Sequence, residues 1–303
     1  LGVVGATSSL QDLGEAGCIF AIGLNPAASH PIAGAQVRNA ALKGTRLVVA
    51  SPYKVAIARY ADLHLSYLPG SELALVAGLI KLLLDEKRID SAFAGRYSHA
   101  IEDLKRSLKP YDLDWVSKAT GVHAETLMEA ACIIGEAASV NVLYGLGLIQ
   151  ADRAPEVLQG LITLAQMKGG FGKPGCGIMP LYGNGNLQGA WDMGMVPYLL
   201  PGQAPGIAGS APLDVLEELV SGKIKAVYLA MENLEGDSLE MFRPYLEKLE
   251  FLVIHDVCRP KLTADVILPM AATAEKRGTL TNGERRVHSF ETVLDPPGQA
   301  RSV

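Results

Sequence analysis

The stretch CIFAIGLNPAASHP, residues 18–31, decides the fold expected for this chain. Its first six residues form an apolar run that ends at a glycine and is followed by Asn25-Pro26, as expected for a buried strand entering a loop. Residues 31–43 are then typical of a helix, with proline at the first position and glycine just past the end. A buried strand followed by a loop and a covering helix predicts a layered α/β fold.

The same alternation continues along the chain. Strands are expected at residues 18–23, 46–50, 64–67, 140–144, 226–231, 251–255 and 266–268. Helices are expected at residues 31–43, 72–84, 91–98, 112–118, 123–136, 155–168, 213–222 and 237–249. This pattern predicts parallel sheets covered by helices. Residues 169–206 are rich in glycine and proline, so we expect no regular secondary structure there. We place a domain boundary near residues 182–184, which gives an α/β domain at 1–183 and a partial second one at 184–303.

Composition limits the functions that the chain can have. Its 303 residues are 49% hydrophobic and 19% charged, which suffices for two α/β domains with buried cores. The net charge is −5 and no basic stripe is present, so nucleic-acid binding is not expected. The longest apolar run is interrupted by Gly78 and Lys81, so no membrane span is expected. The four cysteines lie singly, as is typical of reduced cytosolic thiols, and no iron–sulfur or zinc site is expected within the chain.

The segments that follow the predicted strands are polar or rich in glycine. In an open parallel sheet, ligands bind beyond the carboxyl ends of the strands, so these loops are candidate binding residues. They lie at residues 23–26, 50–53, 69–72, 145–147, 232–233 and 255–256. The sequence contains neither a G-x-G-x-x-G fingerprint nor a Walker A loop, so neither motif identifies the ligand.

Several of these loops resemble, in order, motifs of molybdopterin oxidoreductases of the formate dehydrogenase type. Residues 23–31 (GLNPAASHP) resemble G-x-N-P-x-x-S-H-P, and residues 69–75 (PGSELAL) resemble P-G-T-D-x-A-L. Further matches lie at residues 61–65, 144–150, 172–177, 183–194, 264–269 and 275–287. Because the ordered set spans nearly the whole chain, the chain is identified as similar to this family.

The resemblance implies the formate dehydrogenase/DMSO reductase fold, of which this chain would hold domains 2 and 3 only. Members bind two pterin guanine dinucleotides around one Mo or W, and each of these domains holds one nucleotide. The implied contacts to the first nucleotide are Asn25, Ser29, His30, Ser51, Pro52, Tyr53, Gly70 and Glu72. The implied contacts to the pterin region are Gly145, Gly147, Gln150 and Asn184. The implied contacts to the second nucleotide are Glu232, Asn233, Asp256 and Lys261.

Glu72 has two interpretations. A carboxylate can accept from the ring N–H and the exocyclic amine of guanine together. Alternatively, Glu72 is only a first-turn carboxylate that the helix dipole favours.

Three departures from the family pattern bear on the substrate. Ser51 and Tyr53 stand where the family has Asp and Arg, and Gln159 stands where formate dehydrogenases place an Arg that anchors formate. A neutral amide cannot pair with a carboxylate as Arg does. Arg153, about two helical turns away, is the nearest replacement, so the sequence does not favour formate as substrate.

The resemblance also implies that the chain is an internal piece of a cytoplasmic oxidoreductase. The cysteine ligands of a 4Fe–4S cluster and the metal-binding Cys or selenocysteine would precede Leu1, and a C-terminal barrel would follow Val303. The parent would move two electrons and pass them to iron–sulfur or flavin subunits, whereas this piece alone would be inactive, without metal or cofactor. Two alternatives remain open. One is a cofactor-free structural and electron-wiring subunit of the NADH:quinone oxidoreductase kind, and the other is a stand-alone nucleotide-binding module.

Overall fold

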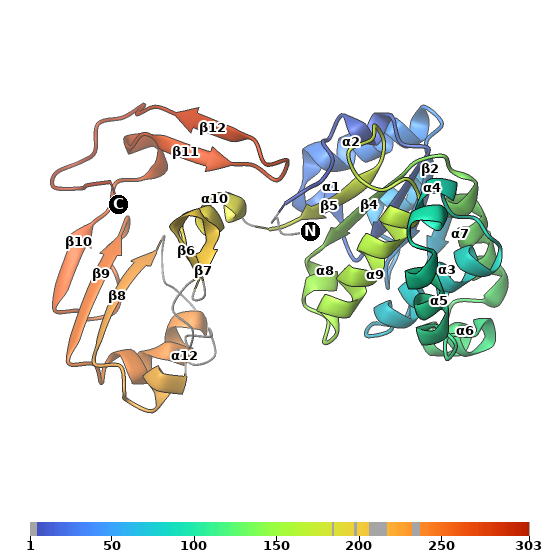
Figure 1. The fold of residues 1–303 in the computed structure, drawn as a ribbon. Coiled ribbons are helices and arrows are strands. Elements are labelled where there is room, and N and C mark those ends of the chain that lie inside the picture. The colour runs from blue at the N-terminus through green and yellow to red at the C-terminus, as the bar shows by residue number, and fades with distance from the viewer. Residues whose placement is uncertain (1–4, 184, 197–198, 206–216, 232–236, 303) are drawn as a thin grey trace. The chain divides into compact units, whose positions relative to one another are not determined.

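The chain consists of two compact units (Figure 1). The computed structural model describes residues 5–183, 185–196, 199–205, 217–231 and 237–302. Unit 1 contains residues 1–185 and 283–286, and unit 2 contains residues 186–282 and 287–303. The first division, after residue 185, lies close to the expected boundary, whereas the assignment of residues 283–286 to unit 1 was not predicted.

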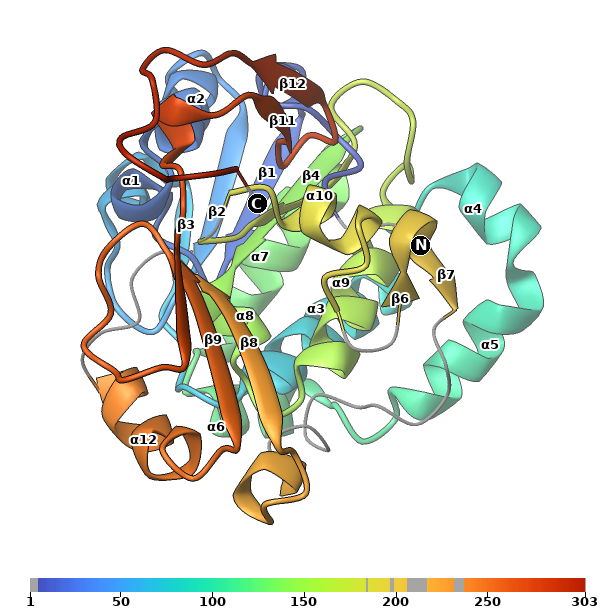
Figure 2. The ribbon, with the colours of Figure 1, turned by 90° about the vertical axis from the view of Figure 1, so that its left-hand side faces the viewer.

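Unit 1 is built on a five-stranded parallel sheet in the order β3-β2-β1-β4-β5 (Figure 2). Its strands are β1 Cys18–Ile22, β2 Arg46–Ala50, β3 Leu63–Leu65, β4 Val140–Gly145 and β5 Gly177–Leu181. Strand β1 pairs with β2 on one side and with β4 on the other, and Ile22 lies opposite both Ala50 and Tyr144. The chain therefore changes its winding direction between β1 and β4, which is where ligands bind in sheets of this kind.

Helices cover both faces of this sheet. The α-helices are α1 Pro26–Ser29, α2 Pro31–Leu42, α3 Glu72–Asp85, α4 Ser91–Arg96, α5 Ser98–Ser107, α6 Leu113–Thr120, α7 Ala124–Glu136, α8 Leu146–Ile149 and α9 Ala154–Met167, with 3-10 helices η1 Asp12–Gly14 and η2 Ala56–Tyr60. Alternate strand residues point to opposite faces. Phe20 and Val48 thus join α3, α7 and α9 in one core, while Ile19 and Val49 join α2 and the 3-10 helices in another.

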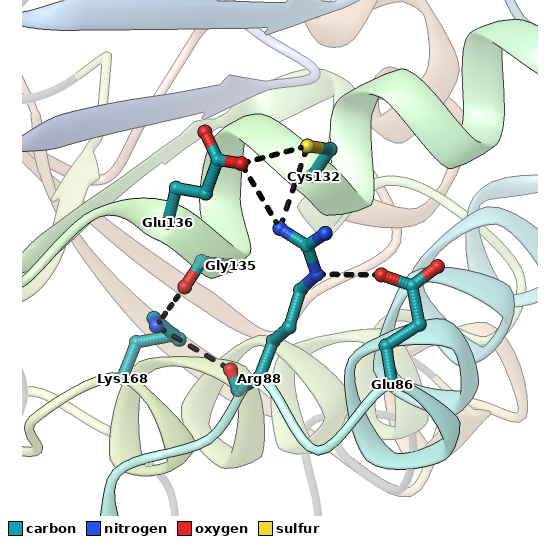
Figure 3. Close-up of polar contacts among 6 residues, drawn as sticks. All are labelled: Glu86, Arg88, Cys132, Gly135, Glu136 and Lys168. Atoms are coloured by element: carbon teal, nitrogen blue, oxygen red, sulfur yellow. Dashed lines mark hydrogen bonds and ion pairs between the residues drawn. The ribbon is translucent and has the colours of Figure 1, made fainter.

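Lys168, which directly follows α9, joins α7 to the turn after α3 (Figure 3). Its Nζ donates to the Gly135 carbonyl at 2.8 Å and to the Arg88 carbonyl at 3.4 Å. Only 7% of Lys168 is exposed, and this burial lowers the pKa of its ammonium group. Near Lys168, at the start of β1, burial raises the pKa of the Cys18 thiol to about 12.

Unit 2 contains a smaller parallel sheet in the order β10-β9-β8. Its elements are α10 Leu187–Asp192, β6 Leu199–Leu200, η3 Pro201–Gln203, β7 Ala204–Pro205, β8 Ala226–Met231, α12 Asp237–Leu246, β9 Phe251–Asp256, β10 Val266–Pro269, η4 Thr273–Glu275, β11 Gly278–Thr281 and β12 Val287–Phe290. Strands β11 and β12 form an antiparallel hairpin. Four side chains form the buried core of this unit, namely Leu246, Leu252, Ile254 and Leu262.

The predicted fold class, parallel sheets covered by helices, is confirmed. The expectation that residues 169–206 lack regular secondary structure is wrong, because β5, α10, β6 and β7 lie there. Strand β5 was not predicted because it is a short run of five residues beside glycines, and its pairing with β4 makes it a strand. The hairpin β11–β12 was not predicted either. Of the helix expected at residues 213–222, residues 213–216 lie outside the described residues and residues 217–220 are helical. No helix in the described part of the chain has the length and apolar character needed to cross a bilayer.

Candidate functional site

A cavity of about 440 Å³ lies at the carboxyl edge of the unit 1 sheet. Its walls come from the ends of all five strands and the loops that follow them. It brings together nine of the residues predicted to contact the first nucleotide or the pterin: Asn25, Ser29, His30, Ser51, Pro52, Tyr53, Glu72, Gly145 and Gly147. It also contains Gly23, Leu24, Pro69 and Leu146 from the predicted strand-end loops. The lining residues outside the predicted loops are Ala28, Val55, Tyr67, Leu181 and Gly183.

Glycines let the loops after β1 and β4 meet backbone to backbone. Gly23 has a φ of 62°, a left-handed conformation that favours glycine. A Cβ on Gly147 would lie 2.9 Å from the Gly23 carbonyl oxygen, and a Cβ on Gly145 would lie 2.8 Å from Cβ of Leu24. These contacts are too close for any side chain. The cavity wall at the switch point therefore depends on glycine at both positions.

Asn25 presents an unsatisfied acceptor at this cavity. It stands at the start of α1, but its side chain makes no capping hydrogen bond, and its Oδ1 is buried without a partner. A buried polar atom without a hydrogen bond is unfavourable, and such an atom in a cavity is typically completed by a ligand or water. Asn25 Oδ1 is thus positioned to accept from a donor that enters the cavity.

His30 ties α1 to the end of β5. Its Nε2 lies 2.6 Å from the Tyr182 carbonyl, so this nitrogen carries a proton and donates. Its Nδ1 lies 2.9 Å from Ser29 Oγ, which is also 3.1 Å from the Asn25 carbonyl. Both side chains of the S-H pair therefore hold the loop in place, and neither is free of protein contacts.

Ser51 is likewise engaged within the protein. It is 2% exposed, and its hydroxyl donates to the Tyr53 carbonyl at 2.6 Å. Because that proton is used, Ser51 Oγ accepts from His64 Nε2, 3.0 Å away. Burial lowers the pKa of His64, although Ser51 and the Tyr53 backbone act in the opposite direction. The Tyr53 side chain is 64% exposed on the cavity rim.

Glu72 is the buried carboxylate of the cavity, only 5% exposed at the first turn of α3. One of its oxygens, Oε1, accepts from the Gly70 backbone N–H at 3.2 Å. Burial raises the pKa of the neighbouring Tyr67, and the charge of Glu72 and a hydrogen bond to it act in the same direction. Sequence reasoning missed Tyr67, although it ends the third predicted strand just before the P-G-S turn.

Other predicted residues lie elsewhere. Gly70 does not line the cavity and contributes through its bond to Glu72. Gln150 and Gln159 are exposed and are not among the residues that line this cavity, so the predicted contact of Gln150 with the pterin region stays a prediction. Arg153, the nearest basic residue to Gln159 in sequence, is ion-paired with Glu156 at 3.0 Å.

The predicted contacts to the second nucleotide fall in or next to unit 2. Asp256 ends β9, is 4% exposed, and accepts from the Cys258 backbone N–H at 3.1 Å. Lys261 is exposed. Three other predicted residues, Asn184, Glu232 and Asn233, lie outside the described residues. Within the described part of the chain, no cluster of three or more His, Cys, Asp or Glu is placed to hold a metal ion.

Comparison with known proteins identifies relatives over the whole length of the chain. A relative, the alpha subunit of F420-dependent formate dehydrogenase 1 from Methanococcus maripaludis, is 34% identical across 97% of this chain and 47% of its own. Formate dehydrogenase H from Escherichia coli is 29% identical across 96% of this chain and 44% of its own. The chain thus spans about half the length of the curated relatives it matches.

The fold has a solved counterpart. Acetylene hydratase from Pelobacter acetylenicus superimposes with a TM-score of 0.76 at 18% identity, covering 99% of this chain and 47% of that protein. The family model of the molybdopterin oxidoreductases matches residues 4–303. The family that the loop motifs predicted is therefore confirmed, and the chain belongs to the molybdopterin oxidoreductases.

Proposed function

We propose that the unit 1 cavity holds one guanine dinucleotide of a molybdopterin cofactor in a larger two-electron oxidoreductase. The observation that carries this proposal is the convergence of nine predicted contact residues on one cavity at the switch point of the sheet. The residues fit such a ligand, since the site offers a buried carboxylate, an unsatisfied amide oxygen and a glycine-lined wall. When bound, the cofactor supplies the two-electron redox chemistry, and this chain binds and orients it.

Glu72 is the residue we assign to guanine. Its carboxylate uses Oε1 for the Gly70 N–H and keeps acceptor capacity for a ring N–H and an exocyclic amine. Asn25 Oδ1 supplies a further acceptor. Unit 2 would bind the second nucleotide through Asp256 and Lys261, together with Glu232 and Asn233.

The parent protein, on this proposal, is formate dehydrogenase-like, holds Mo or W, and passes electrons to iron–sulfur or flavin subunits in the cytoplasm. Its relatives named as formate dehydrogenase subunits support this class. The substrate stays open, because Gln159 is neutral and exposed and Arg153 is already paired with Glu156. Metal analysis and nucleotide release from the full-length parent test the proposal, and the absence of both Mo/W and guanylated pterin would refute it.

A cofactor-free scaffold is the second candidate, and one observation favours it. The Ser51 hydroxyl donates its hydrogen bond to the Tyr53 carbonyl. A ligand would therefore find neither a carboxylate nor a free donor at this position. The residue at the metal position upstream discriminates the two candidates. A Cys or selenocysteine there supports the enzyme, and an apolar residue supports the scaffold.

Calorimetric titration of the chain with GDP and ADP tests the guanine assignment. We expect GDP to bind more tightly than ADP, and Glu72→Gln to weaken GDP by about 1.5–3 kcal/mol and abolish the preference, because a neutral amide loses the charge-assisted hydrogen bonds. The matched control is Glu125→Gln, which removes another first-turn carboxylate, on α7. If both variants behave alike, or GDP and ADP bind equally to the unaltered chain, the assignment of Glu72 to guanine is wrong.

A further inference from the structure

Unit 1 has a second cavity, of about 280 Å³, outside the candidate cofactor site. It is bounded by α1, α2 and η2, and Figure 1 shows the two helices side by side. Ala27 of α1 lines this cavity, whereas the next residues, Ala28 and Ser29, line the cofactor cavity. The two cavities therefore adjoin each other across one short helix without sharing a lining residue.

Two arginines line this second cavity. Arg38 comes from α2 and Arg59 from η2, and the lining contains no Asp or Glu. The Arg38 guanidinium donates a 3.4 Å hydrogen bond to Asn39 Oδ1. Among the residues that the structure describes, neither guanidinium is paired with a carboxylate.

Pairing with a carboxylate is common but not general among the arginines of the described chain. Six of them lie within 4.0 Å of a carboxylate, namely Arg46, Arg88, Arg106, Arg153, Arg243 and Arg286, whereas Arg38 and Arg59 belong to the group that does not. Both arginines are exposed to solvent, so an anion that enters the cavity and reaches the two guanidiniums would gain charge-assisted hydrogen bonds from each. The arrangement therefore favours a negatively charged ligand.

The shape of the cavity limits the size of that ligand. Small residues, Gly34, Ala35 and Ala56, form part of its wall and leave room beside the arginines. A Cβ on Gly34 would lie 3.0 Å from the Ala27 nitrogen, so α1 and α2 are in firm contact. Because drug-sized ligands occupy roughly 300–1,000 Å³, this cavity suits a smaller one. The amino-terminal turn of α2, whose dipole is positive, also lies on the wall.

We propose that this cavity binds a small phosphorylated ligand, with Arg38 and Arg59 gripping the phosphate. A guanidinium presents planar pairs of N–H donors, and a phosphate has enough oxygens to accept from two such groups at once. A carboxylate has only two oxygens and one charge. Tyr60, also in the lining, supplies a hydroxyl donor. The proposal does not rest on the cofactor assignment, since it uses different residues.

Calorimetric titration with inorganic pyrophosphate tests the site, with the cofactor cavity first saturated with GDP. We expect saturable binding that weakens at least tenfold in Arg38→Gln and in Arg59→Gln. Arg96→Gln is the matched control, because Arg96 is exposed and stacks on Tyr97 at 5.5 Å. This variant should bind pyrophosphate like the unaltered chain. Malonate, a dicarboxylate, should bind more weakly.

Three outcomes would overturn the proposal: no saturable binding, equal binding by the unaltered chain and both arginine variants, or malonate binding as tightly as pyrophosphate. GDP affinity of the variants separates this test from the cofactor proposal, because loss of an arginine outside the cofactor cavity should leave GDP binding intact. If GDP does not bind at all, the pyrophosphate titration is run without it. The comparison of the arginine variants with the unaltered chain then tests the proposal in the same way.

Discussion

Substituting Gly147 by alanine tests the backbone contact on which the candidate site is built. The added Cβ would lie 2.9 Å from the Gly23 carbonyl oxygen, whereas ordinary contacts begin near 3.4 Å. Neither loop can easily retreat, because β1 and β4 are hydrogen-bonded neighbours up to the Ile22–Tyr144 pair. The two strand ends must therefore separate by roughly 0.5 Å in a closely packed region.

The magnitude follows from two opposing effects. Forcing an extra methyl group into a packed site costs about 1–3 kcal/mol. Alanine gains up to about 1 kcal/mol over glycine in a helix interior, and Gly147 lies within α8. We therefore expect a net destabilisation of roughly 1–2 kcal/mol. GDP binding should also weaken, because the displaced carbonyl belongs to the cavity wall.

Urea unfolding of unit 1 is the assay. The chain has two tryptophans, Trp115 in unit 1 and Trp191 in unit 2, so a Trp191→Phe background leaves a fluorescence signal from unit 1 alone. Gly95→Ala is the control, because Gly95 lies in α4 with nothing within 4 Å of an added Cβ. It should be stabilised by about 0.4–1 kcal/mol. A Gly147→Ala protein as stable as the Gly95→Ala protein would refute the close approach of the two loops.

Two further predictions concern the amino-terminal edge of the sheet. Cys18 stays protonated in the folded chain because its pKa is raised from 9.0 to about 12, so the unfolded chain loses the proton first and stability falls as the pH rises through 9. Between pH 7 and 10 this costs roughly 1 kcal/mol. Urea midpoints should show a smaller loss in Cys18→Ala than in the unaltered chain, since the raised pKa of Tyr67 lowers stability towards pH 10 in both proteins. Parallel pH profiles would contradict the prediction. Lys168→Met should destabilise unit 1 by about 1–3 kcal/mol, because the carbonyls of Gly135 and Arg88 lose a buried donor (Figure 3). Lys105→Met, which removes an exposed ion pair to Glu102, should cost under about 1 kcal/mol, and equal costs would argue against the role of Lys168.

The elements that can be predicted well from sequence are those whose pattern of apolar and turn residues lies within the element itself. Strands β1, β2 and β4 are unbroken apolar runs that end at turn residues, and their predicted bounds agree with the structure to within a residue. Strand β5 is different. It is a short run between glycines, and it becomes a strand because β4 offers an open edge for pairing. That edge is made by residues more than thirty positions away, so no local pattern contains it.

The candidate site likewise has one property that can be predicted from sequence, its location, and one that cannot, the partners of its side chains. Strand ends can be located from sequence, and parallel strands bring their carboxyl ends to one edge, so the cavity could be anticipated. The hydrogen-bond partners of the side chains in the cavity could not be anticipated. Nothing local in the sequence indicates that the ring of His30 donates to the Tyr182 carbonyl, 152 residues away. The exposure of Gln150 is likewise set by the short helix α8, which it follows directly.

The geometry at Ser51 changes how its substitution should be understood. Seen from sequence, Ser51 only lacks the carboxylate of its relatives. In the fold, its hydroxyl donates to the Tyr53 carbonyl and accepts from His64. A carboxylate could replace the second bond but not the first, since an ionised carboxylate cannot donate. An ionised aspartate at this position would therefore leave the Tyr53 carbonyl without the donor that it has here. Because this bond uses the backbone of Tyr53, it does not depend on the side chain at that position. On the proposed function, cofactor binding here rests on Glu72, Asn25 and the glycine wall.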